Sequence, residues 1–182
     1  MSRKYKFLNP EGIYFVSFAT VYWLDVFVRD RYFNVLIESF RYCQEHLGMR
    51  IHAFCLMPSH VHLIFSATNY NPGDLIKSFK TFTSKKMQSM ILEDPQESRK
   101  EFLMWMMKRA GTKNSNVQNR QFWQQHNKPI ELWSNHVIDQ KVTYVHENPV
   151  EAGFVLEAEY WKYSSAVDYS GGKGLLEIEF LD

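Results

Sequence analysis

The first apolar segments along the chain predict a strand followed by a helix. Residues 13–20 (IYFVSFAT) follow Gly12 and are rich in β-branched and aromatic side chains, which is typical of a buried strand. Between residues 30 and 47, apolar side chains recur at spacings of three and four. This period predicts an amphipathic helix, and Gly48 supplies a residue that readily ends it.

The next two apolar runs predict a pair of strands. Residues 50–57 and 61–66 are both strongly apolar, and Pro58-Ser59-His60 separates them. A break this short between two apolar runs favours a tight turn that joins neighbouring strands. We therefore expect a β-hairpin directly after the first helix.

A second helix is predicted after the turn residues 71–73 (NPG). Asp74 can cap it, and its apolar positions repeat as in a helix while its lysines fall on the other side; these apolar positions are Leu75, Ile76, Phe79, Phe82, Met87 and Ile91. The following stretch, LMWMMK at 103–108, fits either a short helix or a packed loop because polar segments flank it on both sides.

The last predicted elements are a short edge strand and a helix. Residues 120–125 could form the strand, and Ser134 could cap a helix that runs to about Asn148, where Pro149 and Gly153 end it. The order is then β, α, β, β, α, β and a helix. This order predicts an α+β fold, a ferredoxin-like split βαββαβ sheet with helices on one face and an added C-terminal helix. We expect one domain over residues 1–170 and an acidic tail over 171–182.

Composition favours a folded protein that does not enter a membrane. Of the 182 residues, 45% are apolar and 16% are aromatic, enough for a substantial core. No run approaches the roughly 18 apolar residues of a membrane span, and the first residues lack the apolar run of a signal peptide. Cys43 and Cys55 form no zinc-ribbon spacing and cannot build a disulfide scaffold. We therefore expect a cytoplasmic protein.

The charge is distributed unevenly although the net charge is only +1. Residues 77–128 hold eleven Lys and Arg against four acids, a net charge of +7, whereas residues 147–182 hold eight acids and two lysines, a net charge of −6. This asymmetry predicts a basic surface for phosphates and an acidic tail that could cover or flank it. The candidate phosphate contacts are Lys77, Lys80, Lys85, Lys86, Lys108, Arg109, Lys113 and Arg120.

Two histidines on the predicted hairpin are candidate metal ligands. His60 and His62 are two residues apart, so on a strand both imidazoles point to the same side and can reach one ion. Two nitrogen ligands on a rigid strand leave positions open for a third ligand, water and substrate. The alternative is an accidental pair with one ring hydrogen-bonded at the surface.

The last predicted helix carries a second candidate group. The four-residue interval places Tyr144 and Asn148 on one face, together with Lys141, while the opposite stripe is apolar and accounts for core packing. Tyr144 is then free for chemistry. The alternative is that Tyr144 lies at the rim of the apolar face and that Asn148 only ends the helix before proline.

Together these motifs resemble the one-tyrosine HUH transposases, in particular the REP-associated tyrosine transposases and their insertion-sequence relatives. The resemblance extends from about Tyr14 to Tyr169. It rests on MPSHVHLIF at 57–65, FWQQ at 122–125, YVHENPVEAGFV at 144–155 and WKYSSAVDY at 161–169.

The resemblance implies a role for each matching residue. It assigns the metal-binding pair to His60 and His62, the nucleophile to Tyr144 and the third metal ligand to Asn148. The Asn oxygen suits Mg²⁺ or Mn²⁺, whereas two imidazoles favour Mn²⁺ or a heavier metal, so the choice of metal stays open. His136 and His146 lie outside this set, and we interpret both as surface residues.

The implied activity is cleavage and rejoining of single-stranded DNA near a short hairpin, through a 5′-phosphotyrosine. Because a free tyrosine has a pKa of about 10, the nucleophile needs activation, and Lys141 is our candidate cation. Trp105, Phe122 or Trp123 could stack on bases, although core packing is the favoured interpretation of the tryptophans. Both a monomer and a homodimer agree with the resemblance.

Two other functions remain open from the sequence. One is an HUH nickase of replication or conjugation, although such proteins usually carry further domains. The other is a regulator that binds hairpin DNA without turnover.

Overall fold

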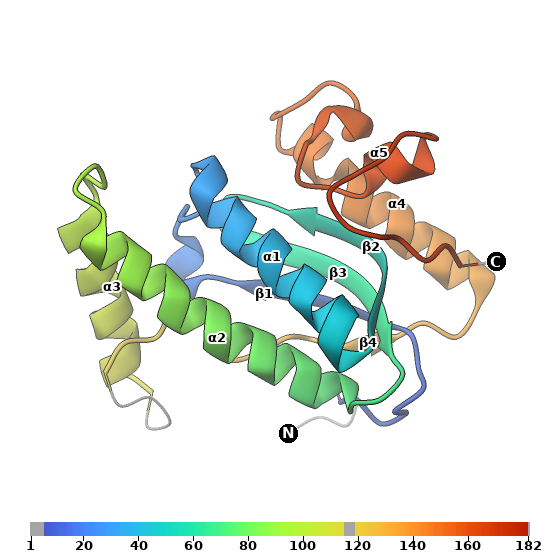
Figure 1. Ribbon diagram of the computed structural model, residues 1–182, viewed down its shortest axis with the longest axis horizontal. Coiled ribbons are helices and arrows are strands. Elements are labelled where there is room, and N and C mark those ends of the chain that lie inside the picture. Colours follow the sequence, from blue (N-terminus) through green and yellow to red (C-terminus); the bar gives the residue numbers. More distant parts are fainter. Residues whose placement is uncertain (1–5, 115–118, 182) are drawn as a thin grey trace.

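The computed structural model describes residues 6–114 and 119–181, so part of the predicted polar segment 111–120 and the last tail residue, Asp182, lie outside it. A four-stranded antiparallel sheet with the order β2-β3-β1-β4 forms its centre (Figure 1). The strands are β1 (Tyr14–Ala19), β2 (Met49–Leu56), β3 (His60–Ala67) and β4 (Ile130–Glu131). The predicted ferredoxin-like arrangement is therefore confirmed.

Helices cover both faces of this sheet. On one face, α1 (Asp30–Leu47) and α2 (Pro72–Glu93) pack on a large apolar core, to which β3 contributes Val61, Leu63 and Phe65 (Figure 1). On the opposite face, α4 (Asn135–Glu151) packs through Val145 on a smaller core that includes Phe15 and Ile64. Successive residues of β3 thus alternate between the two cores, and those facing α4 include the predicted histidines.

The first two helices follow their sequence signals, with two corrections to α2. Gly48 ends α1 in the left-handed conformation, with φ of 65°. Helix α2 begins earlier than predicted, because the side chain of Asn71 and not that of Asp74 caps it, accepting from the backbone N–H of Gly73 at 2.8 Å. The predicted apolar face of α2 is also narrower, since Phe82 is exposed.

The hairpin forms as predicted, and its turn is short. The backbone N–H of Met57 donates to the carbonyl of His60 at 2.8 Å, so Pro58 and Ser59 alone form the loop. Strand β3 therefore begins at His60. Because β3 is a central strand, its backbone is fixed by neighbours on both sides.

The segment between α2 and α4 differs from the prediction in part. Residues 103–108, which fit either a helix or a loop from the sequence, lie in helix α3 (Lys100–Thr112). Residues 120–125 contribute only an isolated bridge between Trp123 and Thr20. The edge strand is instead Ile130–Glu131. Residues 122–127 run irregularly beside the second half of β1 and the residues after it, held by single hydrogen bonds such as that from the N–H of Ser17 to the carbonyl of Asn127 at 3.1 Å.

Helix α4 begins as predicted but ends later. The Ser134 side chain accepts from the backbone N–H of Val137 at 3.4 Å, which caps the helix. Pro149 lies inside the helix, which continues to Glu151. The missing N–H of Pro149 removes one helical hydrogen bond, but later N–H groups still bond: that of Ala152 reaches the carbonyl of Asn148 at 3.0 Å. Gly153, with φ of 74°, follows the helix end.

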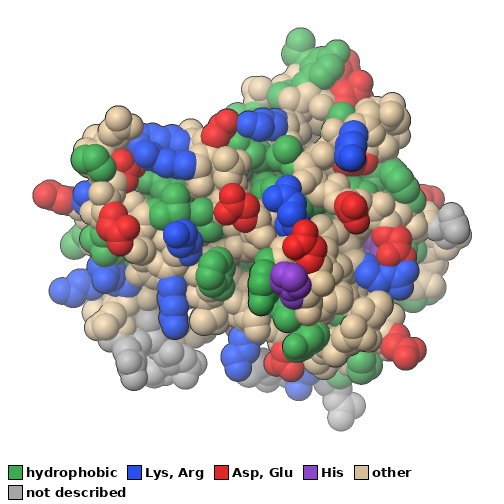
Figure 2. All heavy atoms as spheres, in the orientation of Figure 1, with side chains coloured by type: hydrophobic (Ala, Val, Ile, Leu, Met, Phe, Trp, Pro, Cys, Tyr) green, Lys and Arg blue, Asp and Glu red, His purple; other side chains and the backbone are tan. Residues whose placement is uncertain are grey.

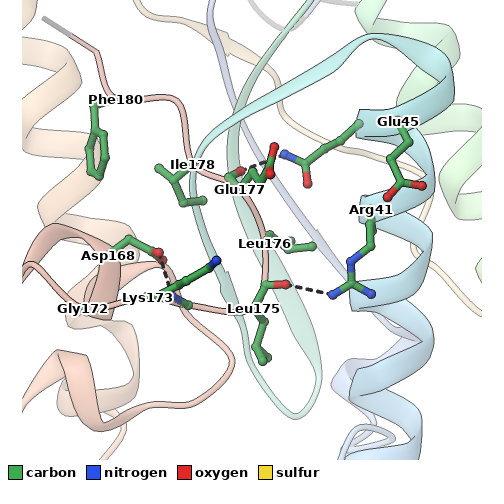
Figure 3. A pocket seen from close by; sticks show the side chains of 12 residues that line it. Arg41, Glu45, Asp168, Gly172, Lys173, Leu175, Leu176, Glu177, Ile178 and Phe180 are labelled. Carbon is green, nitrogen blue, oxygen red and sulfur yellow. Dashed lines mark hydrogen bonds between the residues drawn. The ribbon is translucent and has the colours of Figure 1, made fainter.

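The residues after α4 return to the sheet. Two short helical turns, η3 (Ala158–Tyr160) and α5 (Ala166–Tyr169), precede a tail that lies against α1 and the free edge of β2 (Figure 3). The backbone N–H of Glu179 donates to the carbonyl of Ile51 at 2.9 Å, and Leu176 is buried in the main core. Among the described helices, none is long and apolar enough to cross a membrane.

Candidate active site

The two histidines of β3 lie side by side on the face of the sheet covered by α4. Their ring centroids are 4.8 Å apart. His62 pairs with Ser17 of β1 and with Cys55 of β2, so neighbouring strands hold it on both sides. It is only 3% exposed, whereas His60, at the start of the strand, is half-buried.

Asn148 of α4 completes this group from the other side. Its side-chain oxygen, Oδ1, lies 3.1 Å from Nε2 of His62. Its side-chain nitrogen, Nδ2, donates to the backbone carbonyl of Tyr144 at 2.6 Å. Because the nitrogen is bound to a carbonyl, the amide can adopt only the orientation that turns its oxygen toward the histidines.

Burial keeps both imidazoles uncharged. Removal from water, together with the smaller effect of the neighbouring His60, lowers the pKa of His62 to about 3. Burial also lowers the pKa of His60, against a smaller opposing effect from Asn148. Both rings are therefore neutral near pH 7, which is the form that binds metal ions.

The donor set fits a divalent cation with mixed nitrogen and oxygen ligands. Two neutral imidazoles and one oriented amide oxygen meet here, and Nδ1 of His62 is buried without a hydrogen-bond partner. Within residues 6–114 and 119–181, no three His, Cys, Asp or Glu side chains form a metal-binding cluster. A cation at this position would therefore need Asn148 as its third protein ligand.

Tyr144 lies next to the histidines and is open to solvent. Its side chain is 42% exposed, and its ring centroid lies 5.2 Å from that of His62. The ammonium of Lys141 lies over two rings, 5.2 Å from the centroid of Tyr144 and 5.0 Å from that of Phe15. Phe15 also stacks on His62, so it forms an apolar floor beneath the group.

Comparisons with known proteins agree with this geometry. The family model described as "Transposase IS200 like" matches residues 13–148, which include the histidine pair, Tyr144 and Asn148. The chain belongs to the IS200-like transposase family. Transposases of this family cleave and rejoin DNA, and the resemblance inferred from the sequence motifs is confirmed.

Two individual proteins are also similar. A putative REP-associated tyrosine transposase of Haemophilus influenzae is 23% identical over 167 residues, which cover 91% of this chain and 85% of that protein. The solved structure of a REP-associated tyrosine transposase bound to a REP hairpin covers 100% of this chain and 94% of its own, with a TM-score of 0.67 and 15% identity. This second likeness supports the fold of the transposase.

The other two histidines considered above differ from each other in the transposase. His136 is exposed, as predicted. The prediction for His146 was wrong: it is buried, its Nε2 lies 2.8 Å from Oγ of Ser165, and burial lowers its pKa to about 4. His146 lies on the side of α4 that faces Ser165 and Tyr169, and the chain that follows α4 covers it there.

Four of the predicted basic residues line one shallow groove of about 630 Å³ between α2 and residues 120–127. They are Lys77, Lys80, Lys85 and Arg120. Lys113 lines a second hollow that shares Gln121, Gln124 and Gln125 with the groove. The other three lie elsewhere: Lys108 and Arg109 are exposed on α3, and Lys86 borders an apolar hollow between α1 and α2. Figure 2 shows basic and acidic side chains interspersed over the face formed by α1 and α2.

Lys80 has a structural partner within this groove. Its ammonium donates to the carbonyl of Gln124 at 2.8 Å and to Oδ1 of Asn127 at 2.6 Å. Burial lowers its pKa to about 8. Lys80 therefore holds the irregular segment 122–127 against α2, a role that its position among exposed lysines does not reveal.

The aromatic residues that the sequence offered for base stacking are mostly internal. Phe122 and Trp123 are buried; for Trp123 this confirms the favoured core interpretation, and its indole N–H donates to Oγ1 of Thr83 at 3.0 Å. The core interpretation was wrong for Trp105, which is exposed on α3 with the guanidinium of Arg109 over its ring. Sequence reasoning missed Trp23, which is exposed and lies beside His60 with ring centroids 5.1 Å apart.

Proposed function

We propose that this transposase is a divalent-metal-dependent endonuclease and strand transferase that acts on single-stranded DNA at hairpin-flanked sites. The observation that carries this proposal is the convergence of two elements, β3 and α4, on one small volume. Nε2 of His62 and Oδ1 of Asn148 lie 3.1 Å apart there, and the exposed ring of Tyr144 is next to that of His62. A solvent-accessible nucleophile beside groups that can hold a cation is an arrangement that supports phosphodiester transesterification.

Tyr144 is the proposed nucleophile. Its phenolic oxygen, after loss of the proton to solvent, attacks the phosphorus of a DNA phosphodiester, and the bond to the 3′-oxygen breaks. The products are a 5′-phosphotyrosine and a free 3′-OH. Because the tyrosyl ester replaces one phosphodiester bond by another, a second 3′-OH can displace the tyrosine and join strands without ATP.

The residues around Tyr144 have supporting roles in this proposal. His60, His62 and Asn148 would hold a cation such as Mn²⁺ or Mg²⁺, which when bound offsets the negative charge that develops on the phosphate. Lys141, whose ammonium lies 5.2 Å from the centroid of the tyrosine ring, would favour the phenolate by its charge. Asn148 additionally ties the helix backbone at Tyr144 to the histidine pair.

The groove supports a single-stranded or hairpin DNA substrate. Lys77, Lys85 and Arg120 place positive charge along it, and the segment that Lys80 holds forms its other wall. A similar fold binds a REP hairpin in a solved structure. Binding by such lysines depends steeply on salt, because each phosphate contact releases condensed counterions.

The test is a covalent adduct. The protein is incubated with labelled single-stranded oligonucleotides that carry hairpins and unpaired arms, in Mn²⁺, Mg²⁺ or EDTA, and is then analysed under denaturing conditions. We expect a metal-dependent adduct whose attachment site maps to Tyr144, and none with Tyr144→Phe.

Tyr160→Phe is the matched control, because Tyr160 is also exposed but lies on η3. This variant should form the adduct normally. A protein that binds hairpins tightly yet forms no adduct with any of them would instead be a regulator without turnover.

A further inference from the structure

Two consecutive aromatic residues stand exposed at the end of β1, beside the histidine pair. They belong to the short turn η2 (Val21–Trp23). Trp23 is 57% exposed and Tyr22 is 42% exposed, although both are large side chains. The Trp23 ring meets the ring of His60 edge to face, with centroids 5.1 Å apart and planes at 68°. The contact leaves much of the indole open to solvent.

The backbone at both residues is strained. Tyr22 and Trp23 each have φ of 55°, the left-handed region that side chains with a Cβ rarely adopt. Such strain persists only where the surrounding structure imposes it, and it concentrates at functional sites. Glycine would relieve this strain at no steric cost, yet both positions carry aromatic rings.

Hydrogen bonds within the turn, and from it to two other segments, hold this conformation. The hydroxyl of Thr20 donates to the carbonyl of Leu24 at 2.8 Å, which closes the turn. The N–H of Thr20 donates to the carbonyl of Ser59 at 2.9 Å, and that of Val21 to the carbonyl of Phe122 at 2.8 Å. The turn is thus tied both to the residue that precedes His60 and to the segment that walls the basic groove.

The exposed aromatics also border the proposed route of the DNA. Tyr22 and Trp23 line a hollow of about 680 Å³ together with Lys113 and His126. Residues Gln121, Gln124 and Gln125 belong both to this hollow and to the basic groove along α2. A strand lying in the groove can therefore continue over the aromatic pair to the histidines.

Successive ring contacts link four side chains of the candidate site. From Trp23 to His60, from His60 to His62 and from His62 to Tyr144, the centroids are 5.1, 4.8 and 5.2 Å apart. The exposed indole is thus connected to the nucleophile through the two histidines. A phosphate held at the histidines would place an adjoining nucleotide within reach of Trp23.

We propose that Tyr22 and Trp23 form a stacking platform for an unpaired base next to the phosphate that Tyr144 attacks. This inference rests on the proposed function. Stacking on an aromatic ring accepts any base, so the platform fixes the position of the strand more than it reads its sequence. It thereby determines which phosphate lies over the histidines.

The test combines a Trp23→Ala variant with a missing base. In a Tyr144→Phe background, which removes cleavage, affinity is measured for a hairpin oligonucleotide whose unpaired arms carry one abasic site, moved nucleotide by nucleotide. We expect Trp23→Ala to weaken binding of the intact oligonucleotide by about 5- to 150-fold, the range of one stacked base. At one abasic position, the variant and its parent should bind equally, and Trp23→Phe should retain part of the affinity.

Trp133→Ala is the matched control, since Trp133 is 82% exposed but lines neither the groove nor the hollow. Trp133→Ala should leave the affinities for the intact and for the abasic oligonucleotides unchanged. Mn²⁺ affinity, measured by electron paramagnetic resonance, should also be unchanged in Trp23→Ala.

Three results would overturn the platform. One is equal binding by Trp23→Ala and its parent; another is the same loss at every abasic position; the third is weakened Mn²⁺ binding that accounts for the loss, which would mean that Trp23 only supports His60. Failure of the proposed function is a separate result, because it is scored as absence of the Tyr144 adduct in the otherwise unaltered protein.

Discussion

The side-chain nitrogen of Asn148 lies 2.6 Å from the backbone oxygen of Tyr144, one helical turn earlier on α4. The same amide presents its oxygen to His62 on β3. A candidate metal ligand and the candidate nucleophile are therefore fixed to each other by one side chain. Any shift of α4 along the sheet would move both together, which preserves their mutual geometry.

Two substitutions of Asn148 should distinguish the role of its side-chain oxygen as a metal ligand from the other contacts of the residue. Asn148→Ala removes the proposed third ligand, an amide oxygen, and is expected to weaken Mn²⁺ binding by at least about tenfold. Asn148→Asp keeps an oxygen toward His62 and should restore binding. Isothermal titration with Mn²⁺ measures both, with His136→Ala as the control for an exposed histidine. Unaltered Mn²⁺ affinity in Asn148→Ala would exclude the residue as a ligand.

Removal of the charge at Lys141 should slow DNA cleavage. Methionine keeps the apolar contacts over Phe15 and Tyr144 but lacks the positive charge of the ammonium. We expect Lys141→Met to lower the single-turnover rate of adduct formation roughly tenfold, because the proposed cation beside the nucleophile is lost. The single-turnover rate of adduct formation measures this, and an unchanged rate would eliminate Lys141 from activation.

Two adjacent lysines on α2 allow a direct test of which surface contacts DNA. Lys85 lines the basic groove, whereas Lys86 borders the apolar hollow between α1 and α2. Lys85→Ala should reduce the slope of log affinity against log salt by about 0.7 to 1, because one phosphate contact is lost. Lys86→Ala should leave that slope as it is. Equal effects of the two changes would mean that the DNA does not follow the groove.

Acid should destabilise the protein through His52, which is buried on β2. Burial, followed by the charge of Arg50, lowers its pKa to about 4. Its Nδ1 donates to the carbonyl of Glu179 at 2.7 Å, its Nε2 accepts from the hydroxyl of Ser66 at 2.9 Å, and Tyr169 bonds to its backbone. The neutral ring is therefore the form that the fold accommodates.

The unfolded chain gains a proton on this ring below pH 6.5, while the folded chain gains it only near pH 4. The stabilising contribution is present above pH 6.5 and declines as the pH falls toward 4. Between pH 7 and 5 the free energy of unfolding should fall by about 2 kcal/mol more in the unaltered protein than in His52→Gln. Urea titrations at both values measure this, and parallel losses would contradict it.

Much of the fold was predictable because its signals are local. The period of residues 30–47, the capping serine at 134 and the short break at Pro58-Ser59 each act within a few residues. The alternation of a strand likewise places His60 and His62 on one side without reference to the rest of the chain. The placement of Tyr144 and Asn148 on one face followed from helical spacing alone.

The features that were missed depend on contacts between distant segments. Lys80 is held by residues 124 and 127, and His146 is covered by the chain that returns after α4. Neither partner can be identified from a local pattern. The left-handed turn at Tyr22 and Trp23 gives no glycine signal, because it is held by hydrogen bonds from the backbone N–H groups of the turn to the carbonyls of residues 59 and 122.

The C-terminal tail lies along the edge strand β2 and covers part of that edge of the sheet. An uncovered edge strand offers its unpaired N–H and C=O groups to any other strand, including β2 of a second copy. Here the backbone N–H of Glu179 donates to the carbonyl of Ile51, and the carboxylate of Glu179 pairs with Arg50. Leu176 of the same tail is buried in the main core. Two copies that joined their sheets at β2 would first have to release this tail and expose Leu176. Growth of the sheet at that edge and retention of the tail are thus mutually exclusive states of the same chain.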